Sequence, residues 1–272
     1  MSAEPPNSGA PPGGEGGDRA RSLARLWGAP DPHAPPRRGP KPKHSVEAVV
    51  AAAIALADAE GLDALSMRRV AEMLQLSPMS LYTYVPSKGE LLDLMLDHVV
   101  GEIDEPKPGE GDWRAQVTQL ARARWQTAQR HPWVLQAGMR RPPLGPNVLA
   151  KAEAALRAVD GLGLSETEMD QVTALIADYV RGAVRAALDA AEIERDRGMT
   201  DEQWWSQQGP LLAGLIDRTR YPTTVRIGEA YKAGLMPRPD RQRNFEFGLQ
   251  RVLDGIETYI QTAHPGGRRN PG

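Results

Sequence analysis

The chain has 272 residues, 40% of them hydrophobic, and a formal net charge of −2. That length is enough for one or two domains with a real core, and no run of 18 apolar residues indicates a membrane span. The lack of cysteine excludes disulfides, thiolate catalysis and cysteine-based zinc sites. Because the N-terminus also lacks the apolar stretch of a secretory signal, we expect a cytoplasmic protein without membrane contacts. The near-neutral charge means that any DNA-binding surface must be local.

Residues 1–43 are rich in Pro and Gly and cannot bury enough apolar surface to order themselves, which predicts a disordered arm. Leu23, Leu26 and Trp27 are the exception, since they can form a transient helical turn or dock on another surface. Residues 33–44 carry bases and no acids. This basic segment is either an arm that follows the DNA minor groove or phosphates, or a solubilising tail.

Residues 45–60 predict a first helix, and the stretch from Ser66 to Lys88 predicts two further short helices joined by a tight turn. Ser66 and Ser77 are expected to cap these two helices, and Pro78 is tolerated at the first helical position. The spacing places one apolar face of the second short helix against the preceding helix, through Leu81, Val85, Val70 and Leu74. Its other face then points outward and carries Pro78, Met79, Tyr82 and Thr83.

Small, hydroxyl and aromatic side chains on an exposed helix suit the DNA major groove, where they can meet base edges and the thymine methyl group. Two helices in this arrangement form a helix-turn-helix, whose second helix enters the groove. Acids nevertheless outnumber bases between Val46 and Asp104, which argues against tight non-specific binding.

Three motifs are similar to the DNA-binding domain of the tetracycline-repressor family over roughly residues 45–95. They are Ala-Glu-Gly at 59–61, Leu-Ser-Met-Arg-Arg-Val-Ala at 65–71 and Leu-Tyr-Thr-Tyr-Val-Pro-Ser-Lys-Gly-Glu-Leu-Leu at 81–92. The resemblance implies a three-helix DNA-binding domain, placed at 44–92. We expect Arg68 to bind a guanine and the outward side chains to meet base edges or adjoining phosphates. The candidate DNA-binding residues are His44, Arg68, Ser77, Pro78, Met79, Ser80, Tyr82, Thr83, Tyr84 and Lys88.

The remainder of the chain predicts helices only, so the fold class is all-α, with a larger helical domain at 93–264 and a disordered tail at 265–272. Expected helices begin at Ser87 and Thr200 and cover 113–130, 133–138, 147–159, 165–197, 221–232 and 241–262. Capping boxes are expected at Ser87–Glu90, Ser165–Glu168 and Thr200–Gln203.

Residues 113–134 and 245–257 are similar to the ligand-binding domain of the tetracycline-repressor branch. This resemblance implies a homodimer held by a four-helix bundle, in which each subunit contributes the helices at 165–197 and 241–262. Both helices have apolar faces that are wide enough for such an isologous interface, although the same faces could pack inside one subunit. The candidate interface residues are Val180, Val184, Leu249, Leu253 and Ile256.

Tryptophan is unusually frequent for a chain with only two Phe, and aromatic side chains with a few polar groups can line a pocket for a hydrophobic or aromatic molecule. The candidate effector-binding residues are Trp125, Met139, Tyr179, Trp204 and Trp205, with Arg140 and Gln126 as polar contacts. Packing in the core is the alternative interpretation of each.

No enzyme motif is present, and the five histidines are scattered, so we expect no catalysis, no cofactor and no metal. His131, at a helix boundary, is interpreted as a capping or packing residue. The sequence therefore predicts a ligand-responsive DNA-binding transcriptional regulator, usually a repressor in this family, which a small molecule releases from a palindromic operator. The alternatives are a ligand-blind architectural DNA-binding protein and a helical enzyme.

Overall fold

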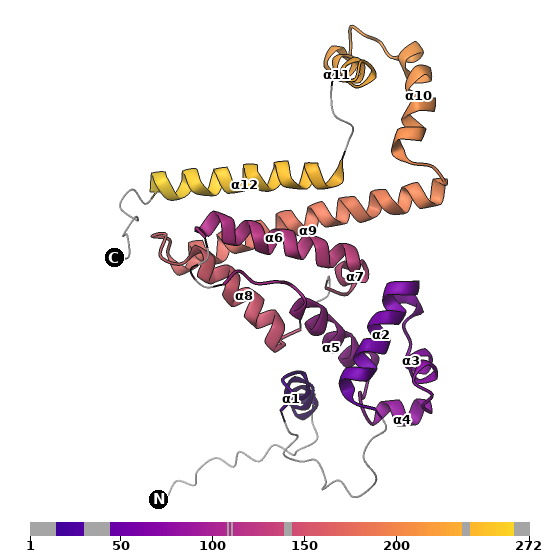
Figure 1. The fold of residues 1–272 in the computed structure, drawn as a ribbon, viewed down its shortest axis with the longest axis vertical. Coiled ribbons are helices and arrows are strands. Elements are labelled where there is room, and N and C mark those ends of the chain that lie inside the picture. The colour runs from indigo at the N-terminus through magenta and orange to yellow at the C-terminus, as the bar shows by residue number, and fades with distance from the viewer. Residues whose placement is uncertain are drawn as a thin grey trace, which may run out of the picture. The chain divides into compact units, whose positions relative to one another are not determined.

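The computed structural model describes residues 15–29, 44–107, 109, 111–138, 143–235 and 240–263. All regular structure within these ranges is helical, as the sequence predicted (Figure 1). In chain order the elements are α1 (Glu15–Leu26), α2 (Val46–Glu60), the 3-10 helix η1 (Leu62–Ala64), α3 (Met67–Met73), α4 (Pro78–Tyr82), α5 (Lys88–Gly101), α6 (Trp113–Arg130), α7 (Trp133–Gly138), α8 (Pro146–Val159), α9 (Glu166–Arg197), α10 (Asp201–Leu215), α11 (Pro222–Lys232) and α12 (Arg241–Ala263).

The chain divides into two compact units whose bounds differ from the predicted domain boundary at 92/93. The first unit comprises Met1–Glu110 and Gln126–Arg157, so it contains α1 to α5 together with α7 and almost all of α8. The second unit comprises Gly111–Trp125 and Ala158–Gly272, with the first part of α6 and the helices α9 to α12. The predicted boundary falls inside α5, which belongs wholly to the first unit.

In the first unit, α2 to α5 share one apolar core. Val70, Leu81 and Val85 are fully buried in it beside Val49 and Leu91, which confirms the inward face expected for the helix-turn-helix. Hydroxyl side chains cap all four helices. Each accepts a hydrogen bond from the backbone N–H three residues later, and the capping residues are Ser45, Ser66, Ser77 and Ser87.

Helix α1 was not predicted, and it changes the role of Glu90. The sequence placed residues 15–26 in a disordered arm, but they form a helix that contacts α5. Arg25 of α1 forms an ion pair with Glu90, and Trp27 Nε1 donates a hydrogen bond of 2.8 Å to the backbone oxygen of Leu144. Ser87 still caps α5, but the Glu90 carboxylate binds Arg25, which replaces the return bond of the predicted capping box. The basic segment of the arm lies outside the described residues up to residue 43.

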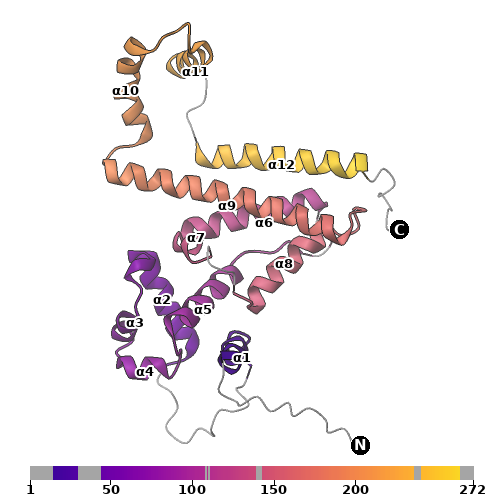
Figure 2. The same ribbon diagram turned by 180° about the vertical axis from the view of Figure 1, so that it is seen from behind.

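In the second unit, α9 and α12 lie side by side and antiparallel (Figures 1 and 2). Arg241, at the start of α12, pairs with Glu194 near the end of α9 at 2.9 Å, and Tyr259, near the end of α12, bonds to Glu168 in the first turn of α9. The capping boxes predicted at Ser165 and Thr200 are both present and fix the starts of α9 and α10.

Helices α10 and α11 stand off the α9–α12 pair in both views (Figures 1 and 2). Every residue of these two helices is described, and none is buried. They nevertheless expose large apolar side chains, together with the segments beside them: Trp205, Leu211, Leu212, Leu215, Tyr221, Ile227, Tyr231 and Leu235. Helices of 15 and 11 residues gain most of their stability from packing an apolar face, and these two have no such packing within one chain.

Candidate DNA-binding and effector-binding sites

The outward face of α4 has the geometry expected for a recognition helix. Pro78, Met79, Tyr82 and Thr83 are all exposed, and the Met79 side chain is 77% exposed. On the inward side, Leu81 is fully buried. The face is held in shape from within, because Ser77 accepts a hydrogen bond from the N–H of Ser80 and the Thr83 hydroxyl donates to the Ser80 backbone oxygen at 2.6 Å.

The turn between α3 and α4 requires an unusual backbone conformation. Gln75 has a φ of 54°, in the left-handed region that non-glycine residues rarely adopt. The N–H of Leu76 then donates back to the oxygen of Ala71 at 2.9 Å, which ends α3 and reverses the chain. The sequence had predicted a tight turn between these two helices.

Arg68 and Arg69, adjacent in α3, have different partners. Arg68 is 78% exposed and has only the neighbouring Glu72 as an ion-pair partner, at 3.3 Å, within the described residues. Arg69 binds Glu60 through both terminal nitrogens, and this hydrogen bonding raises its pKa. The choice of Arg68 as the base-reading arginine is therefore compatible with the structure, whereas Arg69 is engaged in α2–α3 packing.

Three further candidate DNA-binding residues differ in burial. Lys88 is exposed at the first position of α5, and Tyr84 is half-buried after α4. His44 precedes α2, and its Nε2 is the one buried side-chain polar atom without a hydrogen-bond partner in the described part of the chain.

A partly buried polar cluster in the first unit joins α2 to the residues around α7. Asp58 of α2 accepts hydrogen bonds from Trp133 Nε1 at 2.7 Å and faces His131 Nδ1 at 2.8 Å. His131 Nε2 lies 3.2 Å from Glu102, which also accepts from Arg130 at 2.8 Å. The interpretation of His131 as a packing residue agrees with its 5% exposure, but Asp58 was missed because its partners are more than 70 positions away in the chain.

A buried carboxylate joins α5 to α8. Asp97 is 4% exposed and accepts hydrogen bonds from the N–H groups of Asn147 and Val148 and from the Asn147 side chain, so it caps the start of α8 from another helix. Gly145 allows this approach, since a Cβ there would lie 2.1 Å from Asp97 Oδ1. Helix α5 is thus fastened to α8, as α2 is to α7.

The predicted effector residues do not form one group. Trp125 is 4% exposed and stacks on Phe245 at a centroid distance of 4.4 Å, and Tyr179 also stacks with Phe245, at 6.0 Å. The Tyr179 hydroxyl donates to the Phe245 backbone oxygen at 2.8 Å. For Trp125, core packing is therefore the role that the structure gives.

The other candidates lie elsewhere. Trp204 and Trp205, in the first turns of α10, pack edge to face, and Arg197 covers the Trp204 ring at 5.1 Å. The described ring contacts do not join this pair to the Trp125 group. Gln126 is exposed, while Met139 and Arg140 lie outside the described residues.

The predicted dimer-interface side chains lie inside one chain. Each is at most 4% exposed, because α9 and α12 pack these faces against their own neighbours: Val180, Val184, Leu249, Leu253 and Ile256. These five side chains are therefore packed mainly inside one subunit, and Ile256 also lines an open groove.

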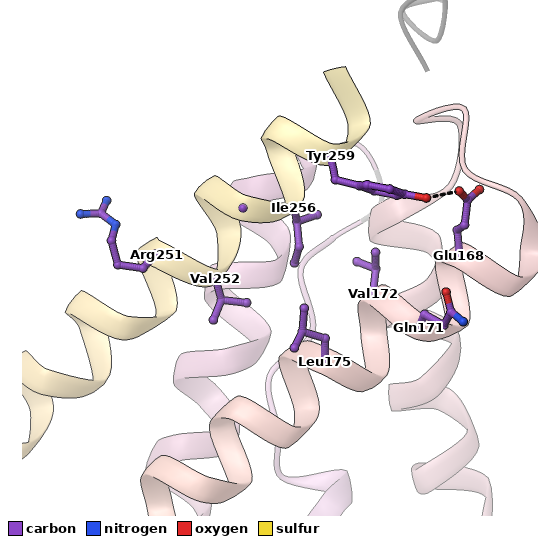
Figure 3. A pocket seen from close by; sticks show the side chains of 9 residues that line it. Glu168, Gln171, Val172, Leu175, Arg251, Val252, Ile256 and Tyr259 are labelled. Atoms are coloured by element: carbon purple, nitrogen blue, oxygen red, sulfur yellow. Dashed lines mark hydrogen bonds between the residues drawn. The ribbon is translucent and has the colours of Figure 1, made fainter. Parts of the chain in front are cut away.

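An apolar groove on the same pair of helices remains open (Figure 3). Val172 and Leu175 of α9 point toward Val252 and Ile256 of α12 across it, and the Tyr259 hydroxyl bonded to Glu168 closes one end. Leu175 is 51% exposed. The groove lies on the two helices to which the sequence assigned the dimer interface, and Ile256 is the one predicted interface residue that lines it.

Among the described residues, no group of three or more His, Asp or Glu residues could hold a metal ion. No helix in the described ranges is long and apolar enough to span a membrane.

A capped three-helix unit with an exposed recognition helix, in a chain that continues as helices only, defines a helix-turn-helix DNA-binding protein. Residues 49–95 match the family described as bacterial regulatory proteins, tetR family, and residues 105–260 match the tetracyclin repressor-like C-terminal domain. The chain belongs to the tetR family of bacterial regulatory proteins, which confirms the resemblance seen in the motifs.

Similar proteins agree with this assignment. The chain is 44% identical to the HTH-type transcriptional repressor DrrR1 of Streptomyces coeruleorubidus over 245 residues, which cover 90% of this chain and 87% of DrrR1. The crystal structure of apo ActR from Streptomyces coelicolor matches with a TM-score of 0.68 and 28% identity, covering 82% of this chain and all of that one. ActR in complex with actinorhodin matches with a TM-score of 0.66 and 28% identity, covering 80% and 99%.

Proposed function

We propose that this protein is a homodimeric repressor that binds a palindromic operator through α4 and leaves it when a small-molecule effector binds the helical C-terminal domain. The observation that carries the proposal is the exposed face of α4, where Met79, Tyr82 and Thr83 stand free of the core that holds Leu81 and Val85. The repressor DrrR1 and the ligand-bound structure of ActR support repression and an effector, respectively.

Operator binding needs two copies of this face. Two recognition helices must lie about 34–36 Å apart to enter successive major grooves, so the operator is expected to be a palindrome with half-sites one turn apart. Arg68 would read a guanine, and Lys88, Tyr84 and His44 would hold the phosphates and sugars on either side.

Two features of the second unit support a homodimer. The groove lined by Leu175, Val252 and Ile256 is an apolar strip on an antiparallel helix pair, and a two-fold axis would turn two such pairs into a four-helix bundle. Helices α10 and α11 expose apolar side chains, and none of their residues is buried among the described residues of their own chain. A second subunit is the surface that would cover both.

The response to an effector would depend on two carboxylates that join helices of the first unit. Asp97 links α5 to α8, and Asp58 links α2 to α7, so a shift of α7 or α8 would change the position of the DNA-binding helices. To act as a switch, the effector must bind more tightly to the state in which the two recognition helices are wrongly spaced for the operator. The coupling free energy between two such sites is typically about 1–3 kcal/mol. We propose this two-state mechanism for release.

The test combines a footprint with a panel of effectors. Purified full-length protein should protect a palindromic sequence from nuclease cleavage, and at least one hydrophobic or aromatic compound should remove the protection in a saturable way. Protection that no compound removes, with no saturable binding to the C-terminal domain, would favour the ligand-blind architectural protein. A protein without a footprint on any sequence in a genomic pool would refute operator binding itself.

A further inference from the structure

The side of α6 in the second unit carries three arginines whose surroundings differ. Arg114 binds Glu257 at 2.9 Å, Gln250 at 2.9 Å and also Asp254, all on α12. Arg122 forms two hydrogen bonds with Glu246 of α12, at 2.7 and 2.8 Å. Both therefore hold α6 to α12 through carboxylates.

Arg124 has no such partner. Its side chain is half-buried, yet within the described residues it makes no hydrogen bond and no ion pair. The charged neighbour that it does have is another cation, Arg181 of α9, whose own partner is Asp178 at 2.8 Å. Burial lowers the pKa of Arg124, and the positive charge of Arg181 lowers it further.

An unpaired, half-buried guanidinium beside a like charge is costly, because it has lost much of its hydration without gaining an acceptor. The nitrogens of Arg124 remain accessible to solvent. Among the described side chains, His44 Nε2 is the one polar atom that is both fully buried and without a hydrogen-bond partner, so the unpaired nitrogens of Arg124 are not fully buried. A guanidinium with free donors in a partly dry site matches the geometry of a carboxylate, which it can bind through two parallel hydrogen bonds.

We propose that Arg124 is the anion-recognition residue of the effector site, and that it binds a carboxylate carried by a planar, largely apolar effector between α6 and α9. The inference deepens the proposed function and rests on it. Arg181 reinforces the positive potential at that point without making the contact, because it is exposed and already paired with Asp178. The carboxylate would supply the counter-charge that the chain itself does not provide within its described part.

The first experiment asks whether Arg124 is structural, and it needs no ligand. Urea unfolding of the ligand-free chain is compared for wild type, Arg124→Met, Arg114→Met and Arg122→Met. If Arg124 awaits a ligand, Arg124→Met keeps or raises the unfolding midpoint, while Arg114→Met lowers it by removing a buried set of bonds. A midpoint lowered by Arg124→Met as much as by Arg114→Met would overturn the proposal.

The second experiment measures the preference for a charge. Benzoate, naphthalene-2-carboxylate and anthracene-2-carboxylate are titrated into the full chain by calorimetry, each beside its own carboxamide. A hydrogen-bonded charge pair predicts that at least one acid binds wild type and Arg122→Met about tenfold or more tighter than its amide. Arg124→Met should abolish that preference and leave the affinity for the amide unchanged.

Three results would overturn the inference: no acid binds, acid and amide bind alike, or the preference survives in Arg124→Met. Operator binding is measured on the same variants, and Arg124→Met should retain it, because Arg124 lies outside the helix-turn-helix. If wild type prefers the acid but binds no DNA, the proposed function fails while the anion site stands. If DNA binding is intact and the preference is absent, the anion site alone fails.

Discussion

Arg68 and Arg69, adjacent in α3, differ in how free their guanidinium groups are to contact DNA, because their ion pairs differ. Arg69 is held by Glu60 through two hydrogen bonds, one of them 2.7 Å long, while Arg68 has an exposed partner one helical turn away. Exposed pairs of that kind contribute only about 0–1 kcal/mol, so Arg68 can exchange Glu72 for a base at little cost. Arg69 would have to give up a bidentate pair.

Arg68→Ala should therefore weaken operator binding by about 1–3 kcal/mol and relax the preference at one base position, since a bidentate arginine–guanine contact discriminates by that amount. The measurement is a binding titration against every single-base variant of the operator half-site. Arg69→Ala is the neighbouring control and should act mainly on stability. Equal weakening on all sequences would instead identify Arg68 as a phosphate contact.

At this scale the sequence was informative where a side chain's environment depends on helical spacing alone. Leu81, Val85 and the exposed face of α4 follow from a period of 3.6, so their placement could be predicted. The environment of Asp58 could not be predicted, because it depends on residues 131 and 133, far away in the chain. The environment of Arg124 could not be predicted either, because it depends on the lack of a nearby acceptor among the described residues. Neither property leaves a local pattern.

At the scale of elements, Asp97 offers a test of how α5 holds α8. Asp97→Ala should destabilise the chain by about 1–3 kcal/mol, because two backbone N–H groups and the Asn147 amide lose their acceptor. Gly145→Ala should cost a similar amount, because its new Cβ would occupy the space of the carboxylate. Urea unfolding of the two single variants and the double variant measures both.

The double variant carries the sharper expectation. If Gly145 matters mainly by admitting the Asp97 carboxylate, Gly145→Ala should cost clearly less once Asp97 is alanine, because only the contact with the Cβ at position 97, at 2.9 Å, then remains. Glu153→Ala on α8 is the control for a general loss of charge. Additive losses would show that Gly145 has a separate role in the loop before α8.

The link between α2 and α7 can be tested in the same way. Asp58→Ala leaves the buried Trp133 Nε1 without its acceptor, and Trp133→Phe removes the donor, so each should cost about 1–3 kcal/mol. Together they should cost less than the sum, because both ends of the bond are then absent. The measurement is a double-mutant cycle from urea unfolding, with the exposed Asp63→Ala as control. A coupling energy near zero would mean that the Asp58–Trp133 bond does not connect the two helices energetically.

Helix bounds were predictable because serine and threonine caps, prolines and glycines mark them in the sequence. Helix α6 agrees with the predicted range at both ends, and α9 begins at its predicted capping box. Helix α1 was missed, because its surroundings are rich in Pro and Gly and its order depends on α5, through Arg25 and Glu90. The capping box expected at Ser87 is incomplete, and Glu90 pairs instead with Arg25.

At the scale of the whole molecule, the burial of Leu253 changes how the dimer should be tested. Leu253 is fully covered in its own chain, so Leu253→Glu is expected to unfold the second unit rather than to separate two folded subunits. Leu175 lines the open groove and is 51% exposed. It can accept a charge in a monomer without loss of the core.

Leu175→Glu should therefore give a folded monomer with greatly reduced operator affinity, because two carboxylates in an apolar bundle cost several kcal/mol and one recognition helix keeps half the contacts. Sedimentation equilibrium reports the mass, and circular dichroism reports the helix content. Leu149→Glu, at an exposed leucine of α8, should change neither. A Leu175→Glu protein that remains dimeric would place the interface away from this groove.

Helices α10 and α11 would then complete their folding only when two chains meet. A segment of this kind has no protected state of its own, so the exchange of its amide hydrogens with deuterated solvent should slow as the protein becomes more concentrated. Amides in α2 and α5 would keep the same exchange rate at every dilution, because their core is complete in one chain. Newly made repressor at low copy number would be most open to proteases at residues 201–232, so the cell's supply of active protein would depend on how quickly each chain finds a second one.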